Sequence, residues 1–417
     1  MRDGDDNQHT TTQEHRASIG IVGGGPASLT LAIALARRGM STTVFERDIH
    51  PDVAPRFHPD RSYTIDTSGH GLRALRHIDA TAHFDERMNR FKGIKILGKY
   101  SEDWNEPAWS ASRGDYQRAL VAIIKAQHQG RVALHFESNV TAVDIGQGRV
   151  TTQQKSGPAT TYTFDLVVGG DGAGSVVRHA LEQQWPGFTV TTKSFPMYCT
   201  VIELDRLDGQ LDRHYLHMFS IYPFVVAGAI RGDQGPDSNR WFGAVCTNRE
   251  LKFSSPSEAS GYLRSRSPRV LEFASEDAVA AFAQRKCYHI GRSLTCSQLH
   301  GGKAVLVGDA AAAFPPIGQG LNAALESSML LDQTIGEVGR SPARLPDAAS
   351  AFSARWKPEV EAAAWVAERH LAENRWHNLR AQVTRVLFGL SVVGEAKRSD
   401  ISYADVKHKA QRIWPLW

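Results

Sequence analysis

The glycine-rich run Gly23–Gly25 constrains the fold of this chain more than any other feature. It follows the apolar run Ile19–Val22, and an apolar period of helical spacing begins at Leu29. A short apolar run of this kind is typical of a buried parallel strand, whereas the period indicates a helix. Gly23 permits a tight turn, and Pro26 suits the first helical turn, where its missing N–H has no cost. The segment is therefore predicted to fold as strand, turn and helix.

The same segment has the pattern of a dinucleotide-binding turn. Gly25 lets the backbone approach a pyrophosphate, and the helix N-terminus offers its amides to the anion. Glu46 follows the next expected strand, Thr42–Phe45, about twenty residues after the turn, where a carboxylate accepts hydrogen bonds from both hydroxyls of an adenosine ribose. Ser28 stands at the third glycine position and is small enough to pack. The alternative is an ordinary glycine-rich turn between a strand and a helix.

Composition narrows the class of protein. The chain has 417 residues, 41% of them hydrophobic and 22% charged, with a formal net charge of +4. These values predict a globular protein of two or three domains and do not indicate a nucleic-acid partner. No run approaches the eighteen or so apolar residues of a membrane span. The four cysteines form no CxxC pair, so we expect no metal site and a reducing, cytoplasmic location.

Two further glycine-rich turns lie downstream. In "FDLVVGGDGAGSVVRHAL", residues 164–181, Asp171 lies in a turn between an expected strand, Leu166–Val168, and a helix starting near Ser175. An acid there is unfavourable unless it caps amides or meets hydroxyls. In "AVLVGDAAAAFPPIGQGLNAALES", residues 304–327, Asp309 follows a strand and Gly320 opens a helix. The acid can hold a ribityl hydroxyl, and the helix amides can stabilise negative charge on a reduced flavin ring.

Together the three motifs resemble those of the class A FAD-dependent aromatic monooxygenases, which share the para-hydroxybenzoate hydroxylase fold. Within that class the resemblance is greatest to kynurenine 3-monooxygenase-like hydroxylases, as in "RSYTIDTSGHGLRALRHI" from Arg61. The resemblance implies an α/β fold in which a Rossmann-like FAD-binding domain carries an inserted β-sheet substrate domain, followed by a C-terminal helical region. It also implies bound FAD, NADPH or NADH as transient co-substrate, O2, a small electron-rich aromatic substrate (an arylamine or phenol, possibly carboxylated) and a monomer or homodimer.

The resemblance further implies individual site residues. Asp171 would serve both FAD and NAD(P)H, Asp309 the ribityl chain, and Pro316, Gly320 and Asn322 the catalytic region beside the flavin ring. The family usually has histidine where this chain has Ala312. The full set of cofactor-binding positions is Gly23, Gly25, Pro26, Ala27, Ser28, Glu46, Arg47, Arg113, Val140, Asp171, Gly172, Asp309, Gly320, Leu321 and Asn322.

Substrate contacts are predicted less specifically. The family arginine that holds a substrate carboxylate maps to about Arg90 or Lys92, and Tyr222 is a further candidate. Leu371 replaces the family's aromatic residue in a C-terminal helix, so the resemblance does not extend to kynurenine itself. His217 is a candidate pocket group, but its strand pattern favours a structural role over that of a base.

The expected domain division follows from these motifs. Residues 1–16 are predicted to be disordered, 17–185 with 291–340 to form the FAD-binding domain, 186–290 the substrate domain, and 341–417 the helical region. Three alternatives share the flavin site: a flavin-dependent reductase, a non-catalytic flavin-binding redox protein, and a flavin-dependent halogenase. The halogenase is disfavoured because the chain has no WxWxIP segment.

Overall fold

The computed structural model describes residues 17–58, 63–155, 157–206, 211–233, 235, 238–370 and 375–414. The predicted disordered segment 1–16 lies outside the described residues, as do Arg61 and Leu371.

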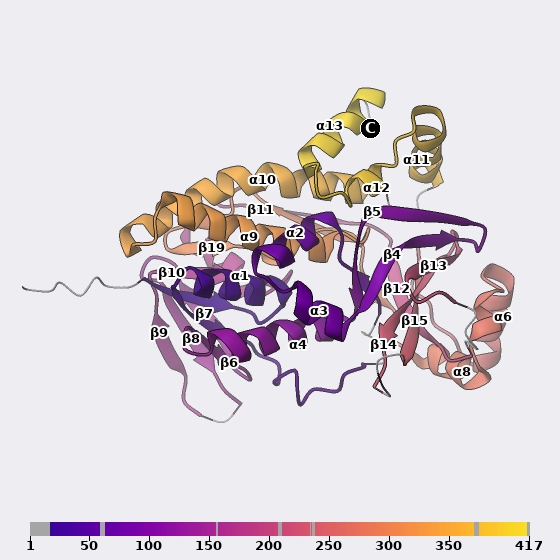
Figure 1. The fold of residues 1–417 in the computed structure, drawn as a ribbon, viewed down its shortest axis with the longest axis horizontal. Helices are drawn as coiled ribbons and strands as arrows, with labels where there is room; N and C mark the ends of the chain where they lie inside the picture. The colour runs from indigo at the N-terminus through magenta and orange to yellow at the C-terminus, as the bar shows by residue number, and fades with distance from the viewer. Residues whose placement is uncertain are drawn as a thin grey trace, which may run out of the picture.

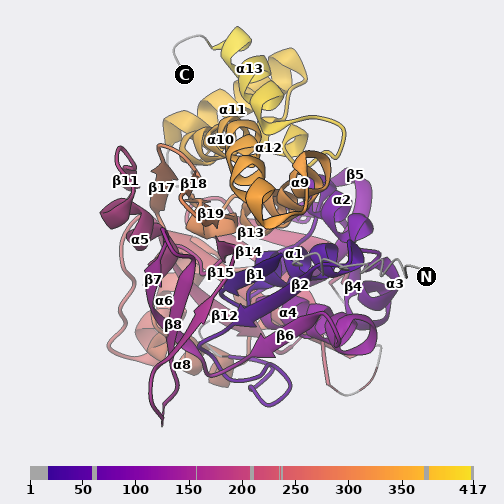
Figure 2. The ribbon, with the colours of Figure 1, turned by 90° about the vertical axis from the view of Figure 1, so that its left-hand side faces the viewer.

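A six-stranded sheet in the order β18-β19-β10-β1-β2-β6 forms one half of the molecule (Figures 1 and 2). The strands from β19 to β6 are parallel, and β18 pairs antiparallel with β19. The four expected strands and the helices after their turns are confirmed, and so is the Rossmann-like fold class. The bounds are β1 (Ser18–Val22), β2 (Ser41–Phe45), β6 (Val132–His135), β10 (Leu166–Gly169), β18 (His300–Gly301) and β19 (Ala304–Leu306).

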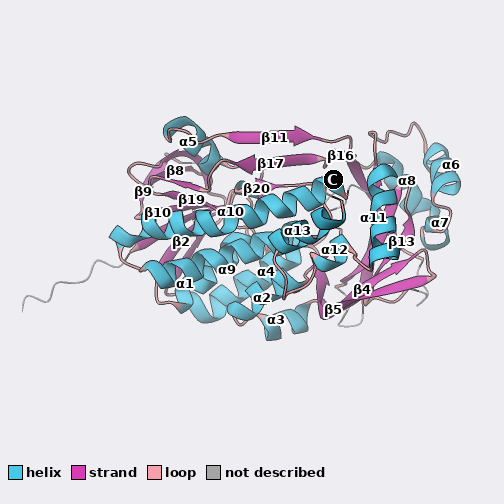
Figure 3. Cartoon of the chain, turned by 90° about the horizontal axis from the view of Figure 1, so that it is seen from above, coloured by secondary structure: helices cyan, strands magenta, loops and turns pink. Residues whose placement is uncertain are grey.

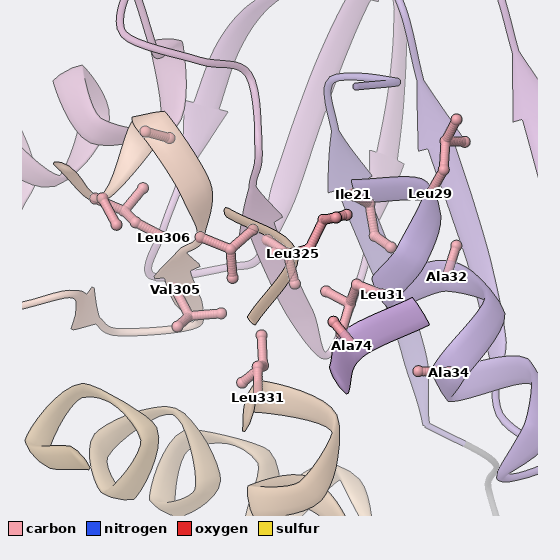
Figure 4. Packing of buried hydrophobic residues seen from close by; sticks show 14 of the residues in the cluster. Ile21, Leu29, Leu31, Ala32, Ala34, Ala74, Val305, Leu306, Leu325 and Leu331 are labelled. Carbon is pink, nitrogen blue, oxygen red and sulfur yellow. The ribbon is translucent and has the colours of Figure 1, made fainter. Parts of the chain in front are cut away.

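Apolar side chains of this sheet and of two long helices form the main core (Figure 4). Helix α1 (Pro26–Arg37) packs against helix α9 (Gly320–Val338), and Ile21, Leu29 and Leu325 are fully buried. Further helices and strands of this half are α2 (Gly69–His77), α3 (Thr81–Arg87), α4 (Arg113–Ile123), which continues as a π-helical turn (Ile124–His128), α5 (Val176–Gln184), and a three-stranded sheet of β7 (Asn139–Asp144), β8 (Arg149–Gln153) and β9 (Thr160–Thr163).

An eight-stranded sheet in the order β16-β12-β15-β14-β13-β4-β5-β3 forms the other half. Three helices that the sequence pattern did not predict, α6 (Pro256–Arg266), α7 (Val270–Phe273) and α8 (Glu276–Gln284), pack on one face through a core that includes Ala227, Leu263 and Phe282. The strand bounds are β3 (Ile65–Asp66), β4 (Asn89–Ile96), β5 (Tyr100–Ala111), β12 (Tyr198–Leu204), β13 (Tyr215–Ser220), β14 (Phe224–Arg231), β15 (Asn239–Thr247) and β16 (Tyr288–His289).

The composition of this sheet bears on the domain division. Strands β3, β4 and β5 belong to it although they lie within residues 17–185, and β4 pairs in parallel with β13. A third sheet, β11 (Val190–Ser194), β17 (Arg292–Cys296) and β20 (Ala312–Ala313), joins the two ends of the expected insert. We therefore propose that the substrate domain includes residues 65–66 and 89–111 as well as most of 186–290.

The C-terminal region is helical, as expected, and covers α9 (Figures 1 and 3). Helix α10 (Leu345–Arg369) continues through Pro358 and buries Phe352 and Trp356 against the core. It is followed by α11 (Arg375–Phe388), α12 (Val392–Glu395) and α13 (Tyr403–Ile413), and two 3-10 turns (Gly308–Ala310 and Pro342–Arg344) complete the elements. In the part of the chain that the structure describes, no helix combines the length and apolarity needed to cross a membrane.

A buried carboxylate ties three helices of the nucleotide-binding half together. The side chain of Asp332 on α9 is 1% exposed and receives Arg38 Nε at 2.6 Å from the end of α1. The same carboxylate contacts His77 Nε2 of α2 at 2.7 Å. Removing one partner of a buried ion pair leaves the other charge uncompensated, which costs more than the pair itself contributes.

We expect Asp332→Ala to lower the free energy of unfolding by about 3 kcal/mol, because Arg38 loses its buried partner. Urea denaturation of the FAD-loaded protein measures this. Glu337→Ala is the matched control on the same helix, since Glu337 and its partner Arg355 are 54% and 48% exposed, and it should change stability by less than about 1 kcal/mol. Equal losses in the two variants would contradict this account of Asp332.

Candidate cofactor and substrate site

The three glycine-rich turns meet at the carboxyl ends of β1, β10 and β19. Gly23 has φ +94°, and a Cβ there would lie 2.6 Å from the carbonyl oxygen of Gly170. Ser28 donates a hydrogen bond to the same oxygen at 3.3 Å, which is the contact that its small side chain allows. In the third turn, a Cβ at Gly308 would lie 3.4 Å from Ala27 Cβ. The motifs are therefore parts of one site, as ligand sites at this edge of parallel sheets usually are.

Glu46 lies where the sequence predicts a ribose-binding acid. Its Oε2 accepts a hydrogen bond from the backbone N–H of Gly24 at 2.6 Å, and its Oε1 accepts one from Asp48 N–H at 2.9 Å. Each carboxylate oxygen retains a second lone pair for a ribose hydroxyl. Gln117, which the sequence analysis missed, holds the turn from the other side by donating from Nε2 to the Gly24 carbonyl at 2.8 Å. No local pattern marks Gln117, because its role depends on where α4 packs.

Two other residues assigned to the ADP half have different surroundings. Val140 is 6% exposed, and its side chain belongs to the main core. Ser138 N–H donates to the Glu46 carbonyl at 2.8 Å, so the chain leading into Val140 runs beside the end of β2. The cofactor contact proposed for Val140 therefore falls to its backbone. The side chain of Arg47 is 76% exposed and lies 4.0 Å from Asp48, so it is open to a ligand phosphate.

Only one of the two carboxylate oxygens of Asp171 accepts a hydrogen bond from the described residues. Its Oδ2 accepts from Val176 N–H at 2.6 Å at the start of α5, whereas Oδ1 is buried without a hydrogen-bond partner among the described residues. Burial raises the pKa of this carboxyl, and the amide hydrogen bonds oppose the rise. A buried acceptor with no donor indicates a missing partner. Gly172, with φ +78°, has no atom within 4 Å of an added Cβ, so a ligand hydroxyl has room to approach.

Arg113 and Asp309 mark the next part of the site. Arg113 begins α4 after the capping box of Ser112 and Asp115, and its Nη2 lies 3.5 Å from where a Gly25 Cβ would be. Asp309 is exposed to solvent, yet desolvation raises the pKa of its carboxyl while Arg113 lowers it. Desolvation of an exposed carboxyl indicates that protein atoms surround it on several sides. We infer that Asp309 faces a hollow that continues toward Arg113 and the first turn.

The segment before α9 forms one wall of this hollow. Pro316 is exposed, Gly318 has φ +77°, and no described atom lies within 4 Å of an added Cβ at Gly320. Leu321 is half-buried. Asn322, in contrast, is fully buried.

The amide of Asn322 is turned into the protein. Its Oδ1 accepts from Ser68 N–H at 2.8 Å, and its Nδ2 donates to the Gly318 carbonyl at 3.0 Å. Asn322 thus holds the Gly318 turn against the start of α2. We propose that it is a positioning residue, and that the backbone at Gly320 faces the cofactor.

The opposite wall is the helix-free face of the eight-stranded sheet. Successive strand residues alternate between faces. Val225 and Ala227 pack against the helices α6 to α8, so Phe224 and Val226 point the other way. The half-buried apolar residues of this face are Cys199, Leu216, Met218, Phe224, Val226 and Ala244, and the ion pair of Arg240 with Glu203 shares the face. The expectation that the inserted strands provide a pocket floor remains a proposal, and the exposed apolar face supports it.

Tyr63, which the sequence analysis missed, directly precedes Thr64 and β3, and we infer that it lies between the two walls. It is 45% exposed, and burial raises the pKa of its hydroxyl. The charges that act on this hydroxyl come from Arg113 and Asp309 in one wall and from Cys199 in the other. Its neighbour Thr64 contacts the sheet, since a Cβ at Gly228 would lie 2.8 Å from Thr64 Cγ2. A single aromatic residue before a two-residue strand gives no sequence signal.

The residues proposed to hold the substrate are not gathered at Tyr63. Arg90 pairs with Asp85 at 2.7 Å, and its guanidinium lies 5.1 Å from the Trp109 ring, on the side of the sheet next to α3. Lys92 is exposed two residues further along the same strand face. Tyr222 is 38% exposed in the turn between β13 and β14. The structure thus gives Arg90 partners within the protein.

His217 has the structural role that its strand pattern favoured. It is 7% exposed, its Nε2 lies 3.0 Å from the Asp212 carbonyl, and its ring packs 5.6 Å from that of Trp241. Burial lowers its pKa.

These observations fit FAD. Glu46 and the Gly23 turn suit an adenosine diphosphate, the available oxygen of Asp171 suits a hydroxyl, and Asp309 with the open backbone at Gly320 suits the ribityl chain and ring. The fold and site therefore define an FAD-binding protein. A family model described as "FAD binding domain" matches residues 16–360, and the chain belongs to this family.

Known proteins agree with this assignment. The chain is 27% identical over 344 residues to a kynurenine 3-monooxygenase of Myxococcus xanthus, an alignment that covers 78% of this chain and 72% of that protein. The solved structure of tetrameric 2-methyl-3-hydroxypyridine-5-carboxylic acid oxygenase superposes with TM-score 0.66 at 19% identity, covering 91% of this chain and 96% of that one. A flavin-dependent brominase, Bmp2, superposes with TM-score 0.68 at 13% identity, covering 95% and 99%.

These known proteins test the expected family, cofactors and activity of the chain. The resemblance to the class A FAD-dependent monooxygenases is confirmed, and so are FAD and a nicotinamide co-substrate as the cofactors of the class. The chain is an FAD-dependent monooxygenase, and the reductase and non-catalytic alternatives are not favoured. The likeness to the brominase is one of fold, since the chain has no WxWxIP segment.

We expect Glu46→Ala to weaken FAD binding by about 1 to 3 kcal/mol, because two charge-assisted hydrogen bonds to the ribose are lost. Titration of the apoprotein with FAD, followed by fluorescence quenching, gives the Kd. Asp48→Ala is the control, since the Asp48 side chain is 76% exposed and only its backbone contacts Glu46. An unchanged Kd in Glu46→Ala would remove Glu46 from the site.

Proposed function

We propose that this protein hydroxylates a small electron-rich aromatic compound, using FAD, O2 and NADPH or NADH. The observation that carries the proposal is the grouping at one sheet edge of Asp171, whose buried Oδ1 has no partner among the described residues, with Asp309 and the open backbone at Gly320. We infer that Tyr63 lies between this edge and the apolar sheet face. A flat aromatic substrate fits between a flavin ring and such a face. The names of its relatives, a kynurenine 3-monooxygenase and an aromatic carboxylic acid oxygenase, support this substrate class.

Different residues of this chain have different roles in the reaction. Bound FAD supplies the electron transfer and oxygen activation of the class. The apolar face of β12 to β15 excludes water from the reacting region, which protects the oxidising equivalents from being lost as H2O2. The N-terminal amides of α9, beginning at Gly320, stabilise negative charge near the ring. Asn322 holds the turn at Gly318 that sets the position of those amides.

Tyr63 is the candidate for orienting the substrate. We propose that its hydroxyl faces the substrate. A tyrosine hydroxyl is protonated at neutral pH, and burial raises its pKa further. A protonated hydroxyl both donates and accepts, so it suits the amino or hydroxyl substituent that activates an aromatic ring. We propose an arylamine or a phenol as substrate. A carboxylate group on the substrate would have to displace Asp85 from its ion pair with Arg90, or bind Lys92.

The cellular location and the oligomeric state are also proposals. We propose a cytoplasmic location, which the four cysteines, all of them described, support because none forms a disulfide and a reducing compartment keeps thiols unpaired. We propose a monomer or homodimer, although the superposed oxygenase is a tetramer.

A panel of arylamines, phenols and their carboxylates tests the function. The purified protein should be yellow, and one compound of the panel should stimulate NADPH or NADH oxidation and gain one oxygen atom by mass spectrometry. If no compound of the panel yields an oxygenated product, even where it stimulates NADPH or NADH oxidation, the proposal is contradicted.

We expect Gly320→Val to bind FAD but to couple poorly, because its side chain enters the space that the open backbone leaves for the ring. More NADPH oxidation should appear as H2O2 and less as hydroxylated product, and Asn322→Ala should show the same effect more mildly. Peroxide and product per NADPH are measured together. Gly261→Val is the control, because Gly261 on α6 also has no atom within 4 Å of an added Cβ. Unchanged coupling in both site variants would place the ring elsewhere.

We expect Tyr63→Phe to raise the substrate KM about two- to tenfold, the value of one hydrogen bond, with FAD affinity unchanged. Steady-state kinetics and FAD titration separate the two quantities. Tyr100→Phe is the control, since Tyr100 is 70% exposed on β5. If Tyr63→Phe changes FAD affinity instead of KM, then Tyr63 contacts the cofactor rather than the substrate.

A further inference from the structure

Cys199 and Cys246 lie directly opposite each other in the eight-stranded sheet. Strand β12 pairs antiparallel with β15, and the unbroken register of the two strands places Cys199 opposite Cys246 (Figure 1). Opposite residues of an antiparallel pair have their side chains on the same face. This is the helix-free face, because Phe224 of β14 lies opposite Cys246 in turn and packs in one small cluster with both cysteines. Neither cysteine is in a disulfide in this structure.

The backbone hydrogen bonds show that the two cysteines form a non-hydrogen-bonded pair. The N–H and C=O groups of successive strand residues point alternately to the two edges of the strand. The carbonyl of Met197 accepts a 2.9 Å hydrogen bond from the chain just after β16, so Cys199, two residues further along, also directs its groups toward β16. The carbonyl of Ser238 accepts a 2.8 Å hydrogen bond from the chain just after β14, so Cys246, an even number of residues further along, directs its groups toward β14. The backbone groups of the two cysteines therefore point away from each other.

A pair of this kind has the spacing that a disulfide needs. The Cα atoms of a non-hydrogen-bonded pair lie about 4.5 Å apart, closer than those of a hydrogen-bonded pair. A disulfide joins residues whose Cα atoms are roughly 4.4 to 6.8 Å apart. The sheet therefore already holds Cys199 and Cys246 at a distance that a covalent bond between their sulfur atoms can span without movement of the backbone.

The pair also lies near the region proposed for the substrate. Burial is the main cause of the raised pKa of Tyr63, and the charges of Cys199 and Cys246 add to it, which places both thiols within electrostatic range of the tyrosine hydroxyl. Cys199 is half-buried, whereas Cys246 is 6% exposed. A small oxidant that reaches Tyr63 therefore meets Cys199 before Cys246.

The other two cysteines have different surroundings. Cys287 packs with the core under α6 to α8, on the opposite face of the sheet, and its Sγ accepts a hydrogen bond from Leu251 N–H at 3.4 Å. Burial raises its pKa. Cys296 on β17 is 4% exposed, and burial raises its pKa to about 12. The thiolate is the reactive form of cysteine, so we expect both residues to remain thiols when an oxidant is present.

We propose that Cys199 and Cys246 are a dithiol that H2O2 oxidises to a disulfide between β12 and β15. The thiolate of Cys199 attacks one oxygen of H2O2, the O–O bond breaks, and a sulfenic acid and hydroxide form. The sulfur of Cys246 then attacks the sulfenic sulfur, so that the S–S bond forms and the S–O bond breaks. Two thiols and one H2O2 thus give one disulfide and two water molecules, and the two sulfur atoms lose the two electrons that the peroxide gains.

Uncoupled turnover supplies the oxidant, and this source rests on the proposed function. A monooxygenase of this kind releases H2O2 when reducing equivalents are not used for hydroxylation. The release takes place on the side of the sheet where Cys199 lies. The thiols of a reducing compartment convert the disulfide back to the dithiol. The pair therefore responds to peroxide at the place where it forms.

Treatment of the full-length, FAD-loaded protein with H2O2 tests the dithiol. After treatment and denaturation, the parent should have lost two of its four titratable thiols, and peptide mass spectrometry should find the peptides of Cys199 and Cys246 linked. Dithiothreitol should restore all four thiols. In Cys246→Ser the sulfenic acid at Cys199 persists, so dimedone should label it there and not in the parent. Because the peroxide is added, this result does not depend on turnover, and a failure of the hydroxylase assay leaves it unaffected.

Cys287→Ser and Cys296→Ser are the matched controls, and each should form the linked peptide in the parent's yield, whereas Cys199→Ser should form none. FAD content and circular dichroism show that each variant is folded. Four thiols remaining in the peroxide-treated parent would overturn the proposal, as would a linked peptide that contains Cys287 or Cys296 in similar yield. Equal dimedone labelling of Cys199 in the parent and in Cys246→Ser would also overturn it, since Cys246 would then not react with the sulfenic acid.

The source of the oxidant is tested without added peroxide. During NADPH oxidation the linked peptide should accumulate faster in Gly320→Val, which is expected to release more H2O2, than in the parent. Equal accumulation in the two proteins, with the response to added H2O2 intact, would overturn turnover as the source and leave the dithiol itself established.

Discussion

Three turns at the carboxyl ends of β1, β10 and β19 approach within van der Waals distance because glycine stands at each point of closest contact. A Cβ at Gly23 would lie 2.6 Å from the Gly170 oxygen, and one at Gly170 would lie 2.1 Å from Ser28 Oγ. These contacts bring Glu46, Asp171 and Asp309, which are far apart in the chain, to one edge of the sheet. The other residues proposed for the site are arranged around this edge.

The electrostatics of the site follow from the same packing. Desolvation raises the pKa of both Asp171 and Asp309, which means that the protein holds these carboxyls where water solvates them poorly. Arg113 opposes this effect at Asp309, and backbone amides oppose it at Asp171. A bound hydroxyl would supply the donor that Asp171 Oδ1 lacks. The opposite sheet face is largely apolar near β13 and β14, and we propose that Tyr63 lies between that face and the acids.

Prediction from sequence succeeded where the signal is local. The strands before each glycine turn and the helices after them were predicted because an apolar run, a turn residue and a helical period follow one another along the chain. The helices α6 to α8 were missed within a segment interpreted as β-rich, although Ser255 and Ser275 cap α6 and α8. The pairing of β4 with β13 could not be predicted, because parallel pairing between residues more than a hundred positions apart leaves no local pattern.

The sequence by itself determined the three glycine turns, the strands before them and the acids at their ends, because glycine spacing, strand length and helical period are properties of short segments. Only the tertiary structure decided which way individual side chains point. Asn322 turns into the protein toward Ser68, Arg90 pairs with Asp85, and α11 exposes Val386 and Leu387. Each of these outcomes depends on contacts between segments distant in the chain, and such contacts arise only when the sheets and helices have packed together.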